Sequence, residues 1–179
     1  MVLPTFEDRL SSIGKDFQIT ASSSITVSEL LARLSLIGCT LPVVPGVLGA
    51  TLGGMLAADI HGKNHFQMGS LGRWVRSLSL MIPSGEVLEC SEQNEPEIFR
   101  ATLGGMGLTG VILSACLEVV PLKGLQAAVN VKTTESLRET IQQLESESGK
   151  SEYVSAWIDF SKGSVAPGRG VVVCGDRIA

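Results

Sequence analysis

One stretch, residues 45–70, constrains the fold and function of this chain more than any other. It reads PGVLGATLGGMLAADIHGKNHFQMGS and combines six glycines with two histidines, one lysine and one aspartate. Because glycine has no Cβ, it lets the backbone approach a flat or charged ligand closely. The polar side chains gather in residues 59–65, so a close-approach segment leads into a polar cluster. That combination is typical of a ligand site.

Composition limits the class of protein and partner. The chain has 179 residues, 44% hydrophobic and 18% charged, which predicts one folded domain or one domain plus part of another. Its net charge of −4 and scattered basic residues argue against a nucleic-acid partner. We find no apolar run of membrane-spanning length and no signal-peptide pattern. Four widely spaced cysteines without a CxxC motif predict buried, reduced thiols in a cytoplasmic protein.

Periodicity predicts an α+β fold for the first two thirds of the chain. Strands are expected over residues 17–21, 74–82, 86–90 and 111–120. Helices are expected over residues 27–36, after a capping box at Thr26–Glu29, and over residues 96–102, with helical character at residues 50–59. Pro83-Ser84-Gly85 joins the second and third strands in a hairpin.

The pattern changes after Gly124. A strand is predicted over residues 125–132, a helix over 134–146 with Leu137, Ile141 and Leu144 on one face, and strands over 152–160 and 170–174. We therefore expect two domains, residues 1–123 and 124–179. Because the chain ends just after a strand whose edge expects a partner, we expect an uncovered sheet edge that offers a place for self-association.

The glycines of the opening stretch leave two interpretations open. Gly53 and Gly54 either mark a tight contact between two elements or let a cofactor phosphate or ring rest on backbone N–H groups at a helix start. The neighbouring polar cluster favours the second interpretation.

Other kinds of site fit this sequence less well. His61 and His65 are four residues apart, but Gly62 lies between them and only Asp59 is near as a third ligand, so no metal site is expected. The chain lacks the G-x-S-x-G pattern of a hydrolase. Residues 105–110 have the glycine spacing of a dinucleotide fingerprint, but they precede a strand and do not open a helix.

What remains is a backbone-lined groove that meets one polar cluster. Lys63 is the best candidate for direct chemistry or for placing an anionic substrate group. His61 is a candidate to hydrogen-bond a flavin or a sugar hydroxyl. Each residue alone would be read as an ordinary surface lysine or a satisfied histidine, and their occurrence together favours a site.

The stretch LPVVPGVLGATLGGMLAADIHGKNH resembles the FAD-binding domain of the vanillyl-alcohol oxidase superfamily and, within it, the decaprenylphosphoryl-β-D-ribose 2-oxidase family most. The matching motifs are Pro45-Gly46, Thr51-Leu52-Gly53-Gly54, Asp59–His65, Gly69-Ser70, Val75-Arg76-Ser77, Ser84-Gly85 and Gly104–Gly110. Ser155-Ala156-Trp157 resembles the start of the substrate (cap) domain. The resemblance implies the second subdomain of a two-subdomain α+β FAD-binding fold in residues 1–123, followed by the start of an α+β cap domain.

The resemblance also implies FAD as the cofactor and a set of residues around it. The implied cofactor-binding residues are Pro45, Gly46, Thr51, Gly53, Gly54, Ala57, Ala58, Gly62, Asn64, His65, Gly69, Gly107, Gly110 and Val111. Lys63 and His61 are implied as catalytic residues on the substrate side of the flavin ring. The implied reaction removes a hydride from a secondary alcohol of a sugar or polyol-type substrate to flavin N5 and leaves a ketone.

The sequence also departs from the family pattern. Residues 1–24 do not resemble the family's arginine- and glycine-rich pyrophosphate loop, the later part of the cap domain is absent, and Met106 stands where the family has asparagine. We therefore expect an internal piece of a flavoenzyme. The alternative function is a non-catalytic remnant of a flavoprotein fold that serves in interaction or assembly.

Overall fold

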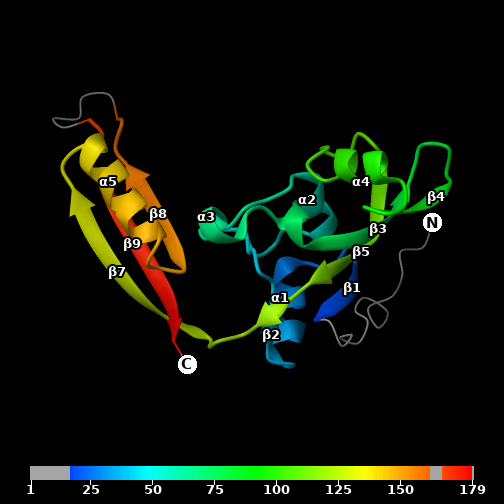
Figure 1. Ribbon diagram of the computed structural model, residues 1–179, viewed down its shortest axis with the longest axis horizontal. Helices are drawn as coiled ribbons and strands as arrows, with labels where there is room; N and C mark the ends of the chain where they lie inside the picture. Colours follow the sequence, from blue (N-terminus) through cyan, green and yellow to red (C-terminus); the bar gives the residue numbers. More distant parts are fainter. Residues whose placement is uncertain (1–16, 162–166, 179) are drawn as a thin grey trace. The chain divides into compact units, whose positions relative to one another are not determined.

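The computed structural model describes residues 17–161 and 167–178 (Figure 1). Within these residues the chain forms two compact units. The N-terminal unit contains residues up to 62 and residues 69–122, and the C-terminal unit contains residues 63–68 together with the chain from residue 123. The short segment 63–68 thus belongs with a part of the chain that follows it by about 60 residues. The roles assigned to the two predicted domains stay predictions.

The N-terminal unit is built on a four-stranded antiparallel sheet in the order β1-β5-β3-β4 (Figure 1). Its strands are β1 (Gln18–Ser22), β3 (Val75–Met81), β4 (Val87–Ser91) and β5 (Val111–Glu118). The helix α2 (Leu52–Ala57) contacts β1 and β5, and α4 (Pro96–Thr102) contacts β4. Ile19, Leu78 and Leu117 lie in the core with at most 1% of their surface exposed. The predicted α+β fold is confirmed, and the predicted strands and helices lie where their patterns placed them.

The helix α1 (Val27–Ser35) begins as its sequence predicts. The Thr26 side chain accepts a hydrogen bond from the Glu29 N–H at 3.3 Å, and the Glu29 carboxylate accepts one from the Thr26 N–H at 3.0 Å. This capping box satisfies two N–H groups that the helix itself cannot pair, which stabilises it by about 1 kcal/mol. The apolar stripe Val27, Leu30 and Leu34 is buried.

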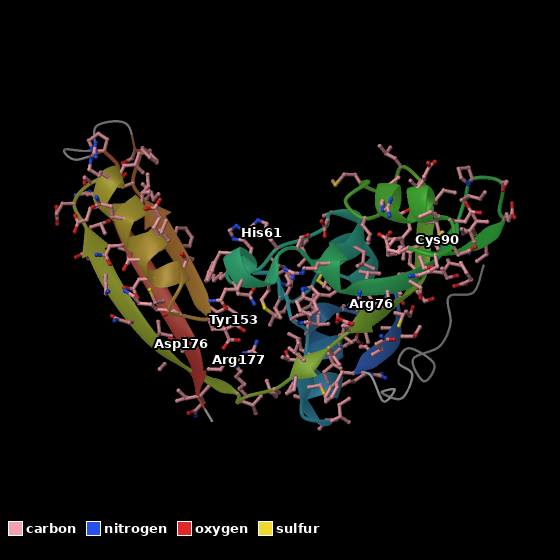
Figure 2. The ribbon with its side chains drawn as sticks, in the orientation of Figure 1. His61, Arg76, Cys90, Tyr153, Asp176 and Arg177 are labelled. Carbon is pink, nitrogen blue, oxygen red and sulfur yellow. The ribbon has the colours of Figure 1, made fainter. Side chains whose placement is uncertain are left out.

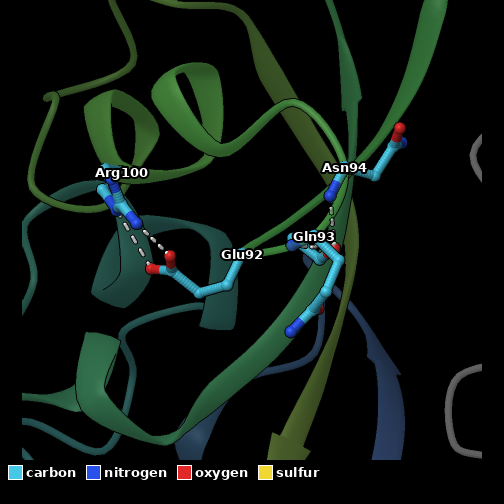
Figure 3. Close-up of polar contacts among 5 residues, drawn as sticks. Glu92, Gln93, Asn94 and Arg100 are labelled. Atoms are coloured by element: carbon cyan, nitrogen blue, oxygen red, sulfur yellow. Dashed lines mark hydrogen bonds and ion pairs between the residues drawn. The ribbon is translucent and has the colours of Figure 1, made fainter.

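The hairpin of β3 and β4 turns at Gly85, whose φ of +88° only glycine adopts easily. Beyond β4, the Arg100 guanidinium on α4 forms an ion pair with the Glu92 carboxylate, with Nε to Oε1 at 3.2 Å (Figure 3). The backbone N–H groups of Gln93 and Asn94 both donate to the Ser91 hydroxyl. These bonds connect the end of β4 to the helix that follows it.

The C-terminal unit is a three-stranded antiparallel sheet with one helix. Its elements are β7 (Gln126–Thr134), α5 (Leu137–Ser148), β8 (Tyr153–Ile158) and β9 (Gly170–Ile178), with the strand order β7-β9-β8. The expectation that the last strand has an uncovered edge is wrong, because β9 pairs with β7 on one side and with β8 on the other. The outer strands of the sheet are β7 and β8.

The predicted apolar face of α5 is also wrong in part. Leu137 and Ile141 are exposed, whereas Thr140 is fully buried and Leu144 packs against the buried cluster of Val154, Val172 and Cys174. Thr140 is buried because its hydroxyl finds partners there, Thr134 Oγ1 at 2.6 Å and the Ser136 carbonyl at 3.0 Å. The hydrophobic pattern predicted that Leu137 and Ile141 would be buried, but the hydrogen-bonded Thr140 is buried in their place.

Four short elements were not predicted as separate elements, although the strand predicted over residues 111–120 includes Val120 of one of them. They are β2 (Cys39–Thr40), β6 (Val120–Pro121), α3 (His65–Met68) and the 3₁₀ helix η2 (Leu71–Trp74). Each has at most four residues, too few to show a hydrophobic period. The pairing of β2 with β6 brings Cys39 opposite Pro121.

The four cysteines are free thiols, and three of them are buried. Burial raises the pKa of the Cys90 and Cys174 thiols, so the thiol form is favoured at both positions. Among the described residues, no helix is long and apolar enough to cross a lipid bilayer.

We predict that the hydroxyl pair of Thr134 and Thr140 stabilises the C-terminal unit. Thr140→Val takes the partner at 2.6 Å from the buried Thr134 hydroxyl and should lower the free energy of unfolding by about 1–3 kcal/mol. Thr134→Val should cost less, because the Thr140 hydroxyl keeps its bond to the Ser136 carbonyl. The double variant Thr134→Val/Thr140→Val removes both hydroxyls, so it should lose clearly less than the sum of the two single variants. Urea unfolding of the four proteins measures the coupling, and additive losses would show that the pair does not interact.

We also predict a stabilising substitution at Met106. Its φ of +52° is a left-handed conformation that costs an L-residue about 1–2 kcal/mol, and its side chain is 73% exposed. Met106→Gly should therefore raise the stability of the N-terminal unit by about 0.5–1 kcal/mol, measured from the urea midpoint. The control Leu108→Gly removes a side chain that is 89% exposed, at a residue without positive φ, so it should not stabilise. Equal effects of the two substitutions would refute the backbone explanation.

Candidate functional site

The first glycine segment, residues 51–54, forms the start of α2, and the N–H groups of residues 52–54 are already paired. Leu52 N–H donates to the Ile25 carbonyl at 2.9 Å, Gly53 N–H to the Ser23 carbonyl at 2.8 Å, and Gly54 N–H to the Thr51 hydroxyl at 3.3 Å. These groups are not available to a phosphate, so the interpretation that places a phosphate on them is wrong.

A close contact between two elements explains Gly53. A Cβ there would lie 3.0 Å from the Ser23 Cβ, at the end of β1. The absence of a side chain lets α2 lie directly on this strand. Gly54 is different, because a Cβ there would meet only the Thr51 hydroxyl, at 3.4 Å. Packing therefore favours glycine at residue 53, where a Cβ would make Ser23 move aside, but does not account for glycine at residue 54.

The second glycine loop, residues 104–110, packs against the other end of α2. Gly104 N–H donates to the Leu56 carbonyl at 3.0 Å, and Met106 N–H donates to the Ala57 carbonyl at 2.8 Å. The last carbonyls of a helix lack partners within the helix, and this loop supplies them. The two glycine stretches, about 50 residues apart in sequence, thereby form one structure.

A cavity of about 350 Å³ lies between these segments, within the N-terminal unit. Its lining residues are small or uncharged: Ser23, Ser24, Thr51, Gly53, Gly54, Ala57, Thr102, Gly107, Val111 and Ile112. Its volume is at the lower end of the range for small-molecule sites. A lining of hydroxyls, glycines and aliphatic side chains suits a flat, uncharged group that offers hydrogen-bonding edges. None of the lining side chains carries a charge that would balance a phosphate.

Six of the residues predicted to bind a cofactor line this cavity, namely Thr51, Gly53, Gly54, Ala57, Gly107 and Val111. The other predicted residues of the N-terminal unit, Pro45, Gly46, Ala58, Gly62, Gly69 and Gly110, are not among its lining residues. Gly110 has a packing role, since its φ is +152° and a Cβ there would lie 2.4 Å from the Met81 carbonyl oxygen.

Four of the lining residues were not predicted from the sequence. Ser23 and Ser24 follow β1, and Thr102 and Ile112 come from α4 and β5. The Thr102 hydroxyl donates to the Ile98 carbonyl at 2.7 Å and lies 2.9 Å from the Thr109 hydroxyl. The run Ser22-Ser23-Ser24 after a predicted strand was the available signal, whereas Thr102 and Ile112 reach the cavity only through the fold.

The polar cluster of residues 59–65 is divided between the two units. In the N-terminal unit, the Asp59 carboxylate accepts hydrogen bonds from the Ser70 hydroxyl at 2.8 Å and from the Gly72 N–H at 2.6 Å. His61 forms an antiparallel bridge with Ser70 and is exposed (Figure 2). Its Nδ1 lies 3.4 Å from the Gly62 carbonyl oxygen.

Lys63, Asn64 and His65 belong to the C-terminal unit. The Lys63 carbonyl accepts a hydrogen bond from the Val154 N–H of β8 at 2.9 Å, and its side chain is exposed. Asn64 is 3% exposed, and its carbonyl begins the turn of α3 by accepting the N–H groups of Gln67 and Met68. His65 is exposed and lies edge-on to Phe66, with 6.4 Å between the ring centroids.

The C-terminal unit carries a polar cluster of its own, at one end of its sheet (Figure 2). The Arg177 guanidinium donates a hydrogen bond to the Tyr153 hydroxyl, stacks over the Tyr153 ring at 5.4 Å, and lies 3.6 Å from the Glu152 carboxylate. The Asp176 carboxylate accepts the Glu152 N–H at 2.7 Å. Burial raises the pKa of the Tyr153 hydroxyl, although Arg177 opposes the shift, so this residue is a neutral phenol at neutral pH.

The sequence matches the FAD binding domain family over residues 3–91. It is 35% identical to decaprenylphosphoryl-beta-D-ribose oxidase of Mycolicibacterium smegmatis over 156 residues, which cover 85% of this chain and 34% of that protein. It is 33% identical to L-gulonolactone oxidase of Bos taurus over 136 residues, 76% of this chain and 30% of the relative. It is 28% identical to D-arabinono-1,4-lactone oxidase of Yarrowia lipolytica over 153 residues, 86% of this chain and 28% of the relative.

The chain thus spans about a third of the length of these curated relatives. All three are oxidases by name, and the matched family is defined by its cofactor. These findings agree with the resemblance inferred from the glycine and DIHGKNH motifs. The chain belongs to the FAD-linked oxidase family, and its cofactor is FAD.

Proposed function

We propose that this chain takes part in the FAD-dependent oxidation of a secondary alcohol on a sugar or polyol-type substrate. The observation that carries the proposal is the open cavity of about 350 Å³ that the two glycine segments line together with Ser23, Ser24 and Thr102. The sugar-type names of the relatives support the substrate class. In this proposal the N-terminal unit is the second subdomain of the FAD-binding fold, and the C-terminal unit is the start of the cap domain.

The lining of the cavity indicates which part of FAD it would hold. Gly54 and Gly107 leave space where a Cβ would stand, and the hydroxyls of Thr51 and Thr102 supply hydrogen-bonding groups. Such a surface fits the uncharged ring and its attached chain better than the diphosphate, because the N–H groups at the start of α2 are engaged. FAD, when bound, supplies the hydride acceptor of the reaction.

In this proposal His61 and Lys63 act on the hydroxyl of the substrate, which loses its proton when the hydride leaves the carbon. Oxidation of an alcohol to a ketone removes a hydride from carbon and a proton from oxygen. We assign His61 as the base that accepts the hydroxyl proton, because a ring nitrogen of the neutral imidazole can accept a proton. We assign Lys63 as the cation that stabilises negative charge developing on that oxygen. Asn64, His65 and the remaining predicted residues stay candidates for cofactor contacts.

The alternative is a non-catalytic role in assembly. Its support is the outer strand β7, whose residues Val129 and Val131 are 61% and 59% exposed. An exposed strand of nine residues is a natural pairing edge. A measurement of flavin binding distinguishes the oxidase from the assembly domain, because a non-catalytic assembly domain does not need a flavin.

We predict that Gly54→Ala weakens FAD binding without loss of stability. The added methyl group meets only the Thr51 hydroxyl within the protein, at 3.4 Å, and alanine favours the helix by about 1 kcal/mol. At the cavity wall the same methyl should raise the Kd for FAD about tenfold or more, measured by flavin fluorescence. Gly49→Ala is the matched control, since a Cβ there meets nothing within 4 Å and Gly49 does not line the cavity. Unchanged affinity in Gly54→Ala would remove this cavity from the proposal.

We predict that His61→Asn and Lys63→Met each slow flavin reduction about 10²-fold while leaving FAD affinity within a few fold. The measurement is the anaerobic bleaching of oxidised flavin absorbance when the FAD-loaded chain is mixed with sugar lactones and polyols. Lys123→Met, an exposed lysine outside the polar cluster, should leave the rate unchanged. If the wild-type chain binds FAD but no sugar-type alcohol bleaches it, the proposed substrate class is wrong. If it binds no FAD, the enzymatic proposal itself fails.

A further inference from the structure

We propose that Asp59 is a positioning residue, whose carboxylate holds the turn that carries His61 in one conformation. The importance of that turn for catalysis rests on the proposed function. The hydrogen bonds of the Asp59 carboxylate to Ser70 and Gly72, which we call the clamp, do not depend on the proposed function. They lie entirely within the N-terminal unit.

The backbone at Asp59 is the first sign of a special role. Its φ is +42°, just after the end of α2, where its N–H donates to the Leu56 carbonyl at 3.1 Å. This is the position at which helices commonly end on a left-handed glycine. An L-residue there is strained, so a glycine would be the better choice for the backbone alone. The aspartate must be explained by its side chain.

The two carboxylate oxygens bind two different groups of the segment 70–72. Oδ1 accepts the Gly72 N–H at 2.6 Å, and Oδ2 accepts the Ser70 hydroxyl at 2.8 Å. A Cβ on Gly72 would lie 2.8 Å from Oδ1, so this approach requires glycine at residue 72. A carboxylate offers two acceptor oxygens at one fixed spacing, which matches these two donors.

The second glycine loop closes around the same residue. A Cβ on Gly104 would lie 3.3 Å from the Asp59 Cβ, and Gly104 has a φ of +77°. Asp59, just after the end of α2, is therefore bonded to the start of η2 at residues 70–72 and is closely approached by the second glycine loop.

The two residues after Asp59, Ile60 and His61, also contact the segment 70–72. The Ile60 carbonyl accepts the Leu71 N–H at 2.8 Å, and His61 forms its bridge with Ser70. The backbone of His61 is thus held by bonds on its N-terminal side, while its ring is exposed. Asp59 adds two further hydrogen bonds to the same segment, to Ser70 and Gly72, through one side chain. It is therefore the residue best placed to fix where the His61 ring points.

The test compares Asp59→Gly, Asp59→Asn and Ser70→Ala with the wild-type chain, without flavin or substrate. Asp59→Gly relieves the backbone strain and removes the clamp. Asp59→Asn keeps an acceptor for Gly72 N–H and can donate to the Ser70 hydroxyl. Glu95→Gly is the matched control, because Glu95 is an acidic residue with a φ of +52° and no capping bond from its side chain. The readouts are amide hydrogen exchange at Leu71 and Gly72 and the side-chain NMR signals of His61, one of only two histidines.

We expect Asp59→Gly to speed exchange at Gly72 about tenfold or more and to shift the His61 ring signals, while the His65 signals stay in place. Asp59→Asn should restore most of the wild-type behaviour, and Glu95→Gly should change neither readout. A merely structural aspartate would alter exchange without moving the His61 ring, and that result would overturn the proposal.

Ser70→Ala keeps the test decisive if Asp59→Gly does not fold, because it removes one of the two bonds and leaves the backbone of Asp59 unchanged. It should shift the His61 signals in the same direction by a smaller amount. Unchanged His61 signals in Ser70→Ala would then overturn the proposal. Since no readout uses flavin, loss of FAD binding or activity in the wild-type chain would count against the proposed function and leave the clamp standing.

Discussion

The N-terminal unit depends on the way the second glycine loop satisfies the end of α2. The Gly104 and Met106 N–H groups donate to the Leu56 and Ala57 carbonyls at the end of this six-residue helix, where the Leu56 carbonyl also accepts the Asp59 N–H. So short a helix has little stability of its own, since its few internal bonds do not offset the cost of ordering it. Contacts at both of its ends keep it in place. The first residues of α2 donate hydrogen bonds to the Ser23 and Ile25 carbonyls, and its last carbonyls accept hydrogen bonds from the second glycine loop. The cavity is lined by residues from both of these contacts.

The same arrangement explains why this site is rich in glycine without being a phosphate loop. Gly53 allows α2 to touch β1, Gly105 lies where a Cβ would be 2.0 Å from the Ala101 carbonyl oxygen, and Gly110 faces the Met81 backbone. Gly107 has no neighbour within 4 Å of a Cβ, but its φ of +79° itself favours glycine. Gly54 differs from these glycines, because a Cβ there would meet only the Thr51 hydroxyl at 3.4 Å, and Gly54 lines the cavity.

The C-terminal unit shows how a polar side chain can replace an apolar one in a small core. Thr140 is buried against Thr134, and the buried cluster of Val154, Val172 and Cys174 lies under the same helix. The segment 63–68 adds Phe66 to that cluster, and the Lys63 carbonyl pairs with β8. A stretch that the sequence presents as one continuous motif therefore contributes to two separate cores, with the change of unit between Gly62 and Lys63.

The sequence by itself determined the elements with a clear period or cap. Thr26–Glu29 predicted the start of α1, Pro96 predicted the start of α4, and alternation predicted the strands, because these signals act between residues close in the chain. The DIHGKNH motif and its resemblance were also sufficient for the family and its cofactor. Tertiary structure decided what depends on distant partners. Thr102 and Ile112 reach the cavity, β9 takes the centre of its sheet, and Asp59 meets Ser70 and Gly72 only after the chain has folded. Local patterns carry no information on which backbone groups will meet across 10 to 50 residues, and those meetings form this site.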